Sequence, residues 1–245
     1  MKSKALVLCK SILWCLVMLM FPILSGALSV IFSLDIAATL VLQGIFMATA
    51  LILPAIFVLR GKWKWKEIGF AQFNIRNCKK VFYFLPLLVI LFPVAIKGFY
   101  IKSISYVLGN LFLYLFVGIA EEVYFRGIIP RYLKEEFSMS GLIMVSTFIF
   151  GIGHITTAFT GSNMFEIVLT VLNAFIFGWL AMEIAILASN ILPAIVLHFL
   201  FDFETKVVVL SSGELLVAEC VRGVLMFIIA VCFAIVIHKQ KETFL

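Results

Sequence analysis

The chain has 245 residues, of which 64% are hydrophobic and 13% are charged, and its mean hydropathy is +1.20. An ordinary soluble domain has about 45–50% apolar and about 25% charged residues, so this composition excludes that class. It predicts an all-α, multi-pass membrane protein, because helices satisfy their own backbone hydrogen bonds in lipid. Lys and Arg outnumber Asp and Glu by 19 to 13, but they lie in short segments between apolar runs. This placement is a topology signal, and we expect no nucleic-acid partner.

Eight apolar runs approach the length of about 20 residues that a helix needs to cross a bilayer. They are residues 11–33, 37–59, 81–100, 104–125, 139–158, 164–187, 190–204 and 215–237. The first follows a basic start, as in a signal peptide, but its apolar run exceeds the about 7–15 residues of such a signal. We therefore expect about eight transmembrane helices, the first of them uncleaved, in one integral membrane domain over residues 1–245.

The basic residues also predict the orientation of the chain. Fifteen Lys and Arg residues fall on the side of both termini, and three, Lys97, Lys102 and Lys206, fall on the other side. Because basic loops remain in the cytoplasm, we expect both termini inside. The segment from Arg60 to Lys80 alternates aromatic and basic residues, which is typical of a segment on anionic lipid or, more simply, of a basic loop with aromatic anchors. The five cysteines show no CxxC or Cys/His spacing, so we expect no disulfide framework.

Ionisable residues within apolar runs need a partner or a water-filled cavity, since a charge at mid-bilayer costs about 2.5–3.5 kcal/mol or more. The stretch GIAEEVYFRGIIP, residues 118–130, places Glu122 and Arg126 four positions apart, the spacing of a helical ion pair. Glu121 points about 100° away and has no cation near it in the sequence. We expect Arg126 to neutralise Glu122 and to leave Glu121 free.

Two later runs carry histidines. The stretch FIFGIGHITT places Phe150 and His154 on one helix face, and PAIVLHFLFD places His198 and Asp202 one turn apart. A single histidine in an apolar helix is usually a hydrogen-bonded packing residue. Two histidines on neighbouring helices, together with an unpaired glutamate on a third helix, indicate a site.

The depth of these residues in the membrane supports a common site. If the helix with Glu121 continues to Leu133, the carboxylate lies about 18 Å from the helix end, and His154 lies about 20 Å from the start of its own helix at Ser140. The two side chains are then level. Pro130 opposes this continuation, because proline kinks a helix.

The chemistry that these side chains offer is activation of a water molecule. Glu121, desolvated among apolar helices, could serve as general base, and His154 could share or relay the proton. His198, oriented by Asp202, could donate a hydrogen bond to an oxyanion. Alternatively, Glu121, His154 and His198 could bind a catalytic zinc ion, with Asp202 behind them. Spacing does not choose between the two, and the protease signatures HExxH and GxSxG are absent from the sequence.

The three motifs occur in a familiar order. EEVYFR fits EExxxR, FGIGH fits FxxxH and HFLFD fits HxxxN/D, and together they resemble the CPBP family, the CAAX-protease and bacteriocin-processing intramembrane proteases that are also called Abi proteins. The resemblance covers a catalytic helical core over residues 104–204. The first three runs match this family only as generic membrane helices.

This resemblance implies a membrane-embedded endopeptidase that cuts peptides or lipidated peptides near the bilayer surface. Its substrates would be prenylated CAAX carboxyl termini or, in bacteria, pheromone and bacteriocin precursors, and a bacterial plasma membrane is the expected location. The catalytic residues would be Glu121, His154, His198 and Asp202, with Glu122 and Arg126 as the supporting ion pair. The family motif more often ends in asparagine, which can donate to an oxyanion, whereas ionised Asp202 only accepts. We expect the peptide bond to be reached from the cytoplasmic side.

Two other functions compete with this one. A transporter would also place charges in membrane helices, but usually in matched halves, and here the charges cluster in the second half. A non-catalytic bacteriocin self-immunity or scaffold protein of the same fold is the stronger alternative. Outside the motifs, Asn173 and Glu183 could line the same cavity, although Glu183 lies near a helix end where we expect it to be solvated. Glu219 and Arg222 could form a local ion pair.

Overall fold

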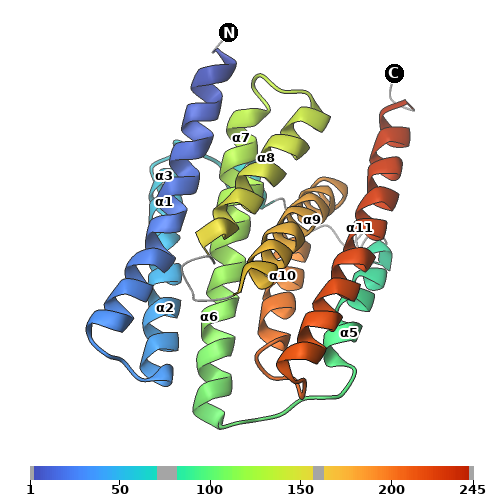
Figure 1. Ribbon diagram of the computed structural model, residues 1–245. Helices are drawn as coiled ribbons and strands as arrows, with labels where there is room; N and C mark the ends of the chain where they lie inside the picture. Colours follow the sequence, from blue (N-terminus) through green and yellow to red (C-terminus); the bar gives the residue numbers. More distant parts are fainter. Residues whose placement is uncertain (1–2, 71–81, 157–162, 243–245) are drawn as a thin grey trace.

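The computed structural model describes residues 3–70, 82–156 and 163–242 (Figure 1). The elements are α1 (Lys4–Ile31), α2 (Ile36–Ala50), α3 (Ile52–Leu59), η1 (Trp65–Ile68), η3 (Phe82–Ile90), α5 (Phe92–Ala95), α6 (Ile104–Glu122), η4 (Val123–Ile128), α7 (Ile129–Leu133), α8 (Met139–Gly153), α9 (Met164–Ala188), α10 (Leu192–Glu204) and α11 (Ser212–Glu242). The described part of the chain has one isolated antiparallel bridge, between Phe99 and Val208. Its cysteines, Cys9, Cys15, Cys220 and Cys232, are free thiols, and Cys78 lies outside the described residues.

Six helices among the described residues are long and apolar enough to cross a membrane. They run over Lys4–Ile31, Ile36–Leu59, Ile104–Leu133, Met139–Thr156, Met164–Ala188 and Ser212–Lys239. The prediction of an all-α, multi-pass membrane protein is therefore confirmed. These helices correspond to the first, second, fourth, fifth, sixth and eighth of the expected spans.

The third and seventh expected spans are shorter elements. The third becomes a 3-10 helix, η3, followed by α5, and it contains Pro86 and Pro93. Proline lacks an N–H donor and clashes with the preceding turn, so it opposes one continuous α-helix. The seventh is α10, whose 13 residues extend over about 20 Å, against a hydrocarbon core of about 30 Å. Both elements pack on longer helices, η3 and α5 on α11, and α10 on α6 and α9.

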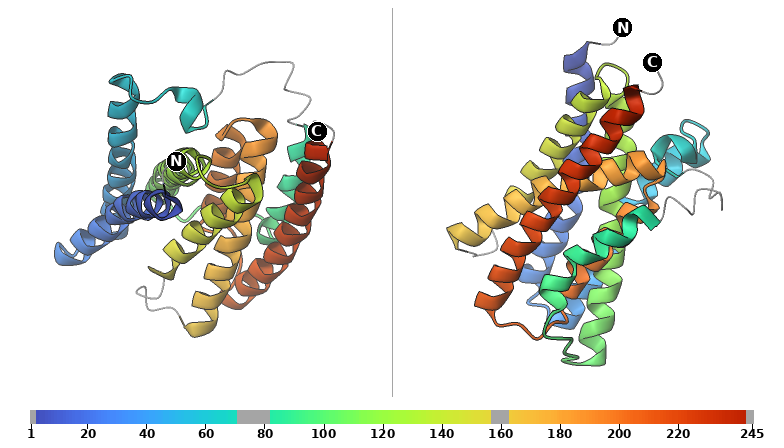
Figure 2. Two further views of the ribbon diagram at one scale, coloured as in Figure 1. Left: turned by 90° about the horizontal axis from the view of Figure 1, so that it is seen from above. Right: turned by 90° about the vertical axis from the view of Figure 1, so that its right-hand side faces the viewer.

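Both chain termini lie at the same end of the helix bundle, which we call the terminus end (Figure 1). α6 starts at the opposite end and rises to the terminus end, while α8 descends from it. α2 packs on α6, and both α8 and α11 pack on α9. α9 is strongly tilted relative to α1 and crosses the bundle, as the two views of Figure 2 show. Termini at one end agree with the expected orientation, in which both lie on the same side of the membrane.

The aromatic and basic segment after α3 differs from a segment that lies on lipid. Trp63 and Ile68 are buried, and the Trp63 ring stacks on Phe57 with 4.4 Å between ring centroids. Trp65 is exposed, as an interfacial anchor would be, and Phe73 lies outside the described residues. The first part of this segment is thus folded against the bundle, because its apolar side chains find partners there.

An ion pair also holds this segment against α7. The Arg131 guanidinium lies 3.3 Å from the Glu67 carboxylate and over the Trp63 ring. The backbone N–H of Lys64 donates to the same carboxylate at 3.2 Å, and this bond lowers the pKa of Glu67 most, with Arg131 adding to the effect. The contact fixes this segment against α7.

Candidate active site

The two glutamates of the first motif lie where α6 changes its helical form. α6 ends at Glu122 and continues as η4, a π-helical turn, and then as α7. Pro130 gives a physical reason, because it has no N–H to donate to the carbonyl of Arg126 and its ring would clash with the preceding α-helical turn. The wider turn keeps the helix continuous to Leu133, as the depth argument requires. Single π-helical turns are frequent at functional sites.

Glu122 joins two helices through its carboxylate. The side chain is fully buried, and its Oε1 atom lies 3.0 Å from Nη1 of Arg126, as the four-residue spacing predicts. The same oxygen lies 2.7 Å from Nδ1 of His198 on α10. Glu122 therefore contacts both Arg126 and His198. The spacing of residues within one helix could not predict the contact with His198, because it joins residues 76 positions apart.

Three carboxylates surround the His198 ring. Besides its hydrogen bond to Glu122, its Nε2 atom lies 3.5 Å from Asp202 and 3.9 Å from Glu121. The sequence predicted Asp202 as the group that orients the ring, whereas the shortest contact belongs to Glu122. Since Glu122 fixes Nδ1, the other nitrogen faces the space between Glu121 and Asp202.

Glu121 is the carboxylate that lacks a close cation, as expected. Its side chain is 17% exposed, and its Oε2 atom lies 3.9 Å from Nε2 of His198. The buried Oε2 atom has no hydrogen-bond partner in the described part of the chain. A separation of 3.9 Å is too long for a direct hydrogen bond but suits a bridge through one water molecule.

His154 lies at the end of α8 and faces the same region. Its Nδ1 atom lies 3.0 Å from the Phe150 carbonyl oxygen. His154 and Glu121 both line a small cavity of about 140 Å³, so the structure brings together the two residues that the depth argument placed at one level. Gly151 provides close packing, since a Cβ there would lie 2.5 Å from the Phe175 ring of α9. The glycine thus leaves room for the Phe175 side chain.

A second and larger cavity, of about 460 Å³, begins at His154 and His198. We call it the access cavity. Among its lining residues are Phe150, Asn173, Phe177, Phe201 and Asp202. His154 lies between this cavity and the smaller one that contains Glu121. Asn173 therefore lines the site region as predicted. Glu183 does not line it, and the expectation that it is solvated is wrong, because it is buried and bound by Trp179 Nε1 at 2.7 Å.

The three-ligand zinc arrangement receives no support from this geometry. Within the described ranges, no group of three or more His, Cys, Asp or Glu side chains is placed to hold a metal ion. One nitrogen of His198 is directed at Glu122, and one nitrogen of His154 is directed at a backbone carbonyl. The arrangement of Glu121, His154 and His198 therefore does not favour a three-ligand metal site.

A second buried cluster surrounds Arg222 of α11. The expected Glu219–Arg222 pair is present at 3.1 Å. Glu204 adds a contact of 2.5 Å, and the Arg222 guanidinium lies over the Phe201 ring. Sequence reasoning missed Glu204. The available signal was its spacing of three from Phe201, which places both on one face of α10.

In this multi-pass membrane protein, Glu121, Asp202 and the two histidines thus lie around two adjoining cavities. Residues 103–203 match the family model described as Rce1-like, type II CAAX prenyl endopeptidase Rce1-like. The matched segment is less than half of the chain and contains all three motifs, so the family model supports the resemblance to the CAAX-protease family. Comparison with curated proteins and with solved structures gives no match.

Proposed function

We propose that this chain is an intramembrane endopeptidase whose catalytic core is residues 104–204 in a single membrane domain. The observation that carries the proposal is the geometry of Glu121. Its buried Oε2 atom makes no hydrogen bond in the described part of the chain, faces Nε2 of His198 across 3.9 Å and lies in a residue that shares a cavity with His154. A structural ion pair explains why Glu122, which is bound to Arg126, is buried. It does not explain Glu121.

In the proposed reaction, Glu121 takes a proton from a water molecule, and the water oxygen attacks the carbonyl carbon of the peptide. The tetrahedral intermediate collapses as the C–N bond breaks, and the proton passes to the leaving amine, with His154 as the relay. His198 donates from Nε2 to the oxyanion while Glu122 holds Nδ1. The Asp202 carboxylate helps to position the His198 ring and stabilises the positive charge on it.

Glu122 and Arg126 act as positioning residues. The Arg126 guanidinium is buried against the Phe150 ring, 4.1 Å from its centroid, and compensates the charge of Glu122. A buried carboxylate without this compensation would be costly. The pair thus lets Glu122 remain ionised as the acceptor for His198.

The proposed substrates are peptides at the membrane. The family name points to prenylated CAAX carboxyl termini, and secreted-peptide precursors such as pheromones or bacteriocins are the second class. We propose a bacterial plasma membrane as the location. The competing function is non-catalytic bacteriocin self-immunity, or a scaffold role, on the same fold. The unpaired Glu121 carboxylate favours the enzyme, because a scaffold gains nothing from it.

The test uses the protein purified in detergent, with a quenched prenylated CAAX peptide and a library of short secreted-peptide precursors. Glu121→Ala and His154→Ala should each abolish cleavage, whereas the matched controls Glu136→Ala and His238→Ala should retain it at equal thermal stability. Cleavage that persists in a chelator supports the metal-free reaction, and loss that zinc restores supports the zinc alternative. A folded parent that cleaves neither substrate class would favour self-immunity or a scaffold role.

A further inference from the structure

We infer that the peptide reaches the active site from the face of the membrane opposite the chain termini, which the charge distribution makes the extracytoplasmic face. The inference rests on the proposed function. It specifies the side of the membrane from which the peptide enters, and this side determines the class of substrate. It differs from the cytoplasmic access that the sequence led us to expect. Three features carry it: a closed layer, an open cavity and the positions of the basic residues.

The closed layer lies between the site and the terminus end. Phe125 lies on η4, one turn beyond Glu121, and Phe150 lies on α8, one turn before His154, so both are on the terminus side of the catalytic groups. Their ring centroids are 5.0 Å apart. Phe177 of α9 joins them, 6.2 Å from Phe150. All three side chains are at most 3% exposed.

Further packing extends this layer towards the terminus end. Arg126 lies against the Phe150 ring, and the Ser146 hydroxyl donates to the Phe125 carbonyl at 2.8 Å. Along η4 and α7, four side chains have no exposed surface: Tyr124, Ile128, Ile129 and Leu133. A peptide approaching from the terminus end would have to displace this packed core. Displacement is costly, because close-packed side chains do not accommodate extra atoms or leave voids without a loss of stability.

The access cavity extends in the other direction. It is lined by the beginning of α9, the end of α10 and the beginning of α11, including Glu166, Thr170, Lys206, Ser212 and Leu215. Figure 1 shows that α11 begins at the end of the bundle opposite the termini. Arg222, the deepest α11 residue in this lining, lies about 15 Å from the start of α11 and about 30 Å from its end. The cavity therefore extends from the catalytic groups towards the far end.

The lining also suits an extended peptide. It carries the carboxylates of Glu166, Asp202 and Glu219 and the cations of Lys206 and Arg222. Such a polar wall favours water and can bind the backbone amides of an unfolded segment, which a lipid-filled groove could not do. A peptide in this cavity would end at His154 and His198.

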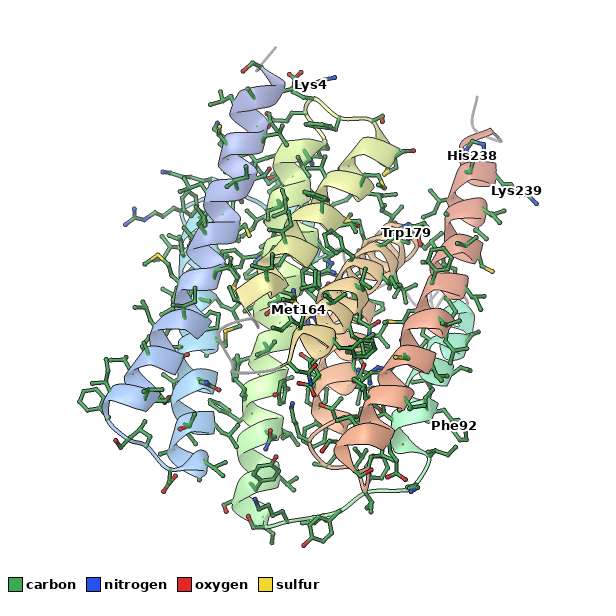
Figure 3. The ribbon with its side chains drawn as sticks, in the orientation of Figure 1. Lys4, Phe92, Met164, Trp179, His238 and Lys239 are labelled. Atoms are coloured by element: carbon green, nitrogen blue, oxygen red, sulfur yellow. The ribbon has the colours of Figure 1, made fainter. Side chains whose placement is uncertain are left out.

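The basic residues assign the two ends of the bundle to the two sides of the membrane. Lys4, His238 and Lys239 lie at the terminus end, whereas Phe92 lies towards the opposite end (Figure 3). The charge pattern of the sequence assigns fifteen Lys and Arg residues to the side of the termini and three to the far side. The positive-inside rule places the terminus end in the cytoplasm. The cavity mouth then faces outward, and the substrate class is a secreted or translocated peptide rather than a cytoplasmic lipidated carboxyl terminus.

The test measures access from each side without requiring cleavage. In a full-length chain with all five cysteines changed to serine, single cysteines are placed by Leu215→Cys, Thr170→Cys and Ser212→Cys in the cavity wall. Lys134→Cys marks the terminus side, and Lys102→Cys marks the far side. A charged, membrane-impermeant thiol reagent is added to intact cells and to inverted vesicles. The cavity positions should react at least tenfold faster in cells, as Lys102→Cys does, and Lys134→Cys should react only in vesicles.

Each other outcome has a defined meaning. Cavity cysteines that react only in inverted vesicles would overturn the inference, and so would labelling of Lys134→Cys from outside, which would show an inverted chain. A thermal melt of each variant identifies any cysteine variant that fails to fold. The use of three cavity positions means that the test does not depend on one variant. If labelling shows outward access while no peptide is cleaved, the access inference stands and the proposed function fails. If cleavage occurs but only vesicle-side reagent blocks it, the enzyme stands and the inference fails.

Discussion

The bundle contains two buried arginine clusters that look alike in composition. Arg126 lies over Phe150 and pairs with Glu122, and Arg222 lies over Phe201 and pairs with Glu204. Both guanidinium side chains are 1% exposed. In each case the arginine is followed directly by a glycine, Gly127 or Gly223. Burial, charge and aromatic packing alone do not separate them.

The clusters differ in what lies beyond the ion pair. Arg222 is held by two carboxylates, Glu204 and Glu219, and Asn173 binds the second of these, so the network closes on itself. Glu122 instead passes its hydrogen bond to His198, whose other nitrogen faces Glu121. A closed network stabilises a fold, whereas a network that ends in a histidine and an unpaired carboxylate can move a proton. The distinction is one of connectivity.

The largest expected effect tests the unpaired carboxylate itself. Glu121→Gln keeps the shape of the side chain but removes the base, so the rate of peptide cleavage should fall by about 10²–10⁴-fold. The matched change in the other cluster, Glu204→Gln, should leave cleavage per folded molecule within about threefold, since Glu204 does not line the access cavity. Cleavage rates at equal folded fraction measure this. Equal losses in the two variants would remove the distinction between the clusters.

The next effect concerns stability. Glu122→Gln leaves Arg126 without its carboxylate in a buried position, and breaking such a pair costs about 3–5 kcal/mol. Glu204→Gln should cost less, because Glu219 still compensates Arg222 at 3.1 Å. Unfolding in a graded denaturing detergent measures the difference, with the parent as reference. A greater loss in Glu204→Gln would show that the Arg222 cluster is the more strained of the two.

Much of this arrangement follows from the sequence, and the missing part has a physical cause. The periodicity of apolar runs and the spacing of Glu122, Arg126, His198 and Asp202 predict which side chains share a helix face. Contacts such as Glu122 with His198, or Glu204 with Arg222, depend on how α10 packs against its neighbours, and spacing within one helix carries no information on that. Likewise, Pro130 predicts a disturbance, but the π-helical turn that accommodates it depends on the surrounding packing.

The two glycines sharpen the comparison at the level of packing. A Cβ on Gly127 would lie 2.4 Å from the backbone carbonyl oxygen of Ile68, whereas a Cβ on Gly223 would meet the side-chain oxygen of Asn173 at 2.4 Å. Backbone cannot move aside easily, so Gly127→Ala should cost about 1–3 kcal/mol. Gly223→Ala should cost less than about 1 kcal/mol, because the amide can rotate and alanine favours the helix. Thermal melts of both variants test the order.

The smallest effect concerns the last motif residue. Asp202 lies 3.5 Å from Nε2 of His198, and its side chain is 28% exposed, so it lies at the solvent-accessible edge of the site. Asp202→Asn keeps a hydrogen-bonding group of the same size and adds a donor that can face the oxyanion. We expect cleavage within about tenfold of the parent, which corresponds to about 1.4 kcal/mol in the barrier. Asp202→Ala, which removes every hydrogen bond, should lose more. If asparagine is as damaging as alanine, then the negative charge of Asp202, and not only its hydrogen bond, is what the His198 imidazolium requires.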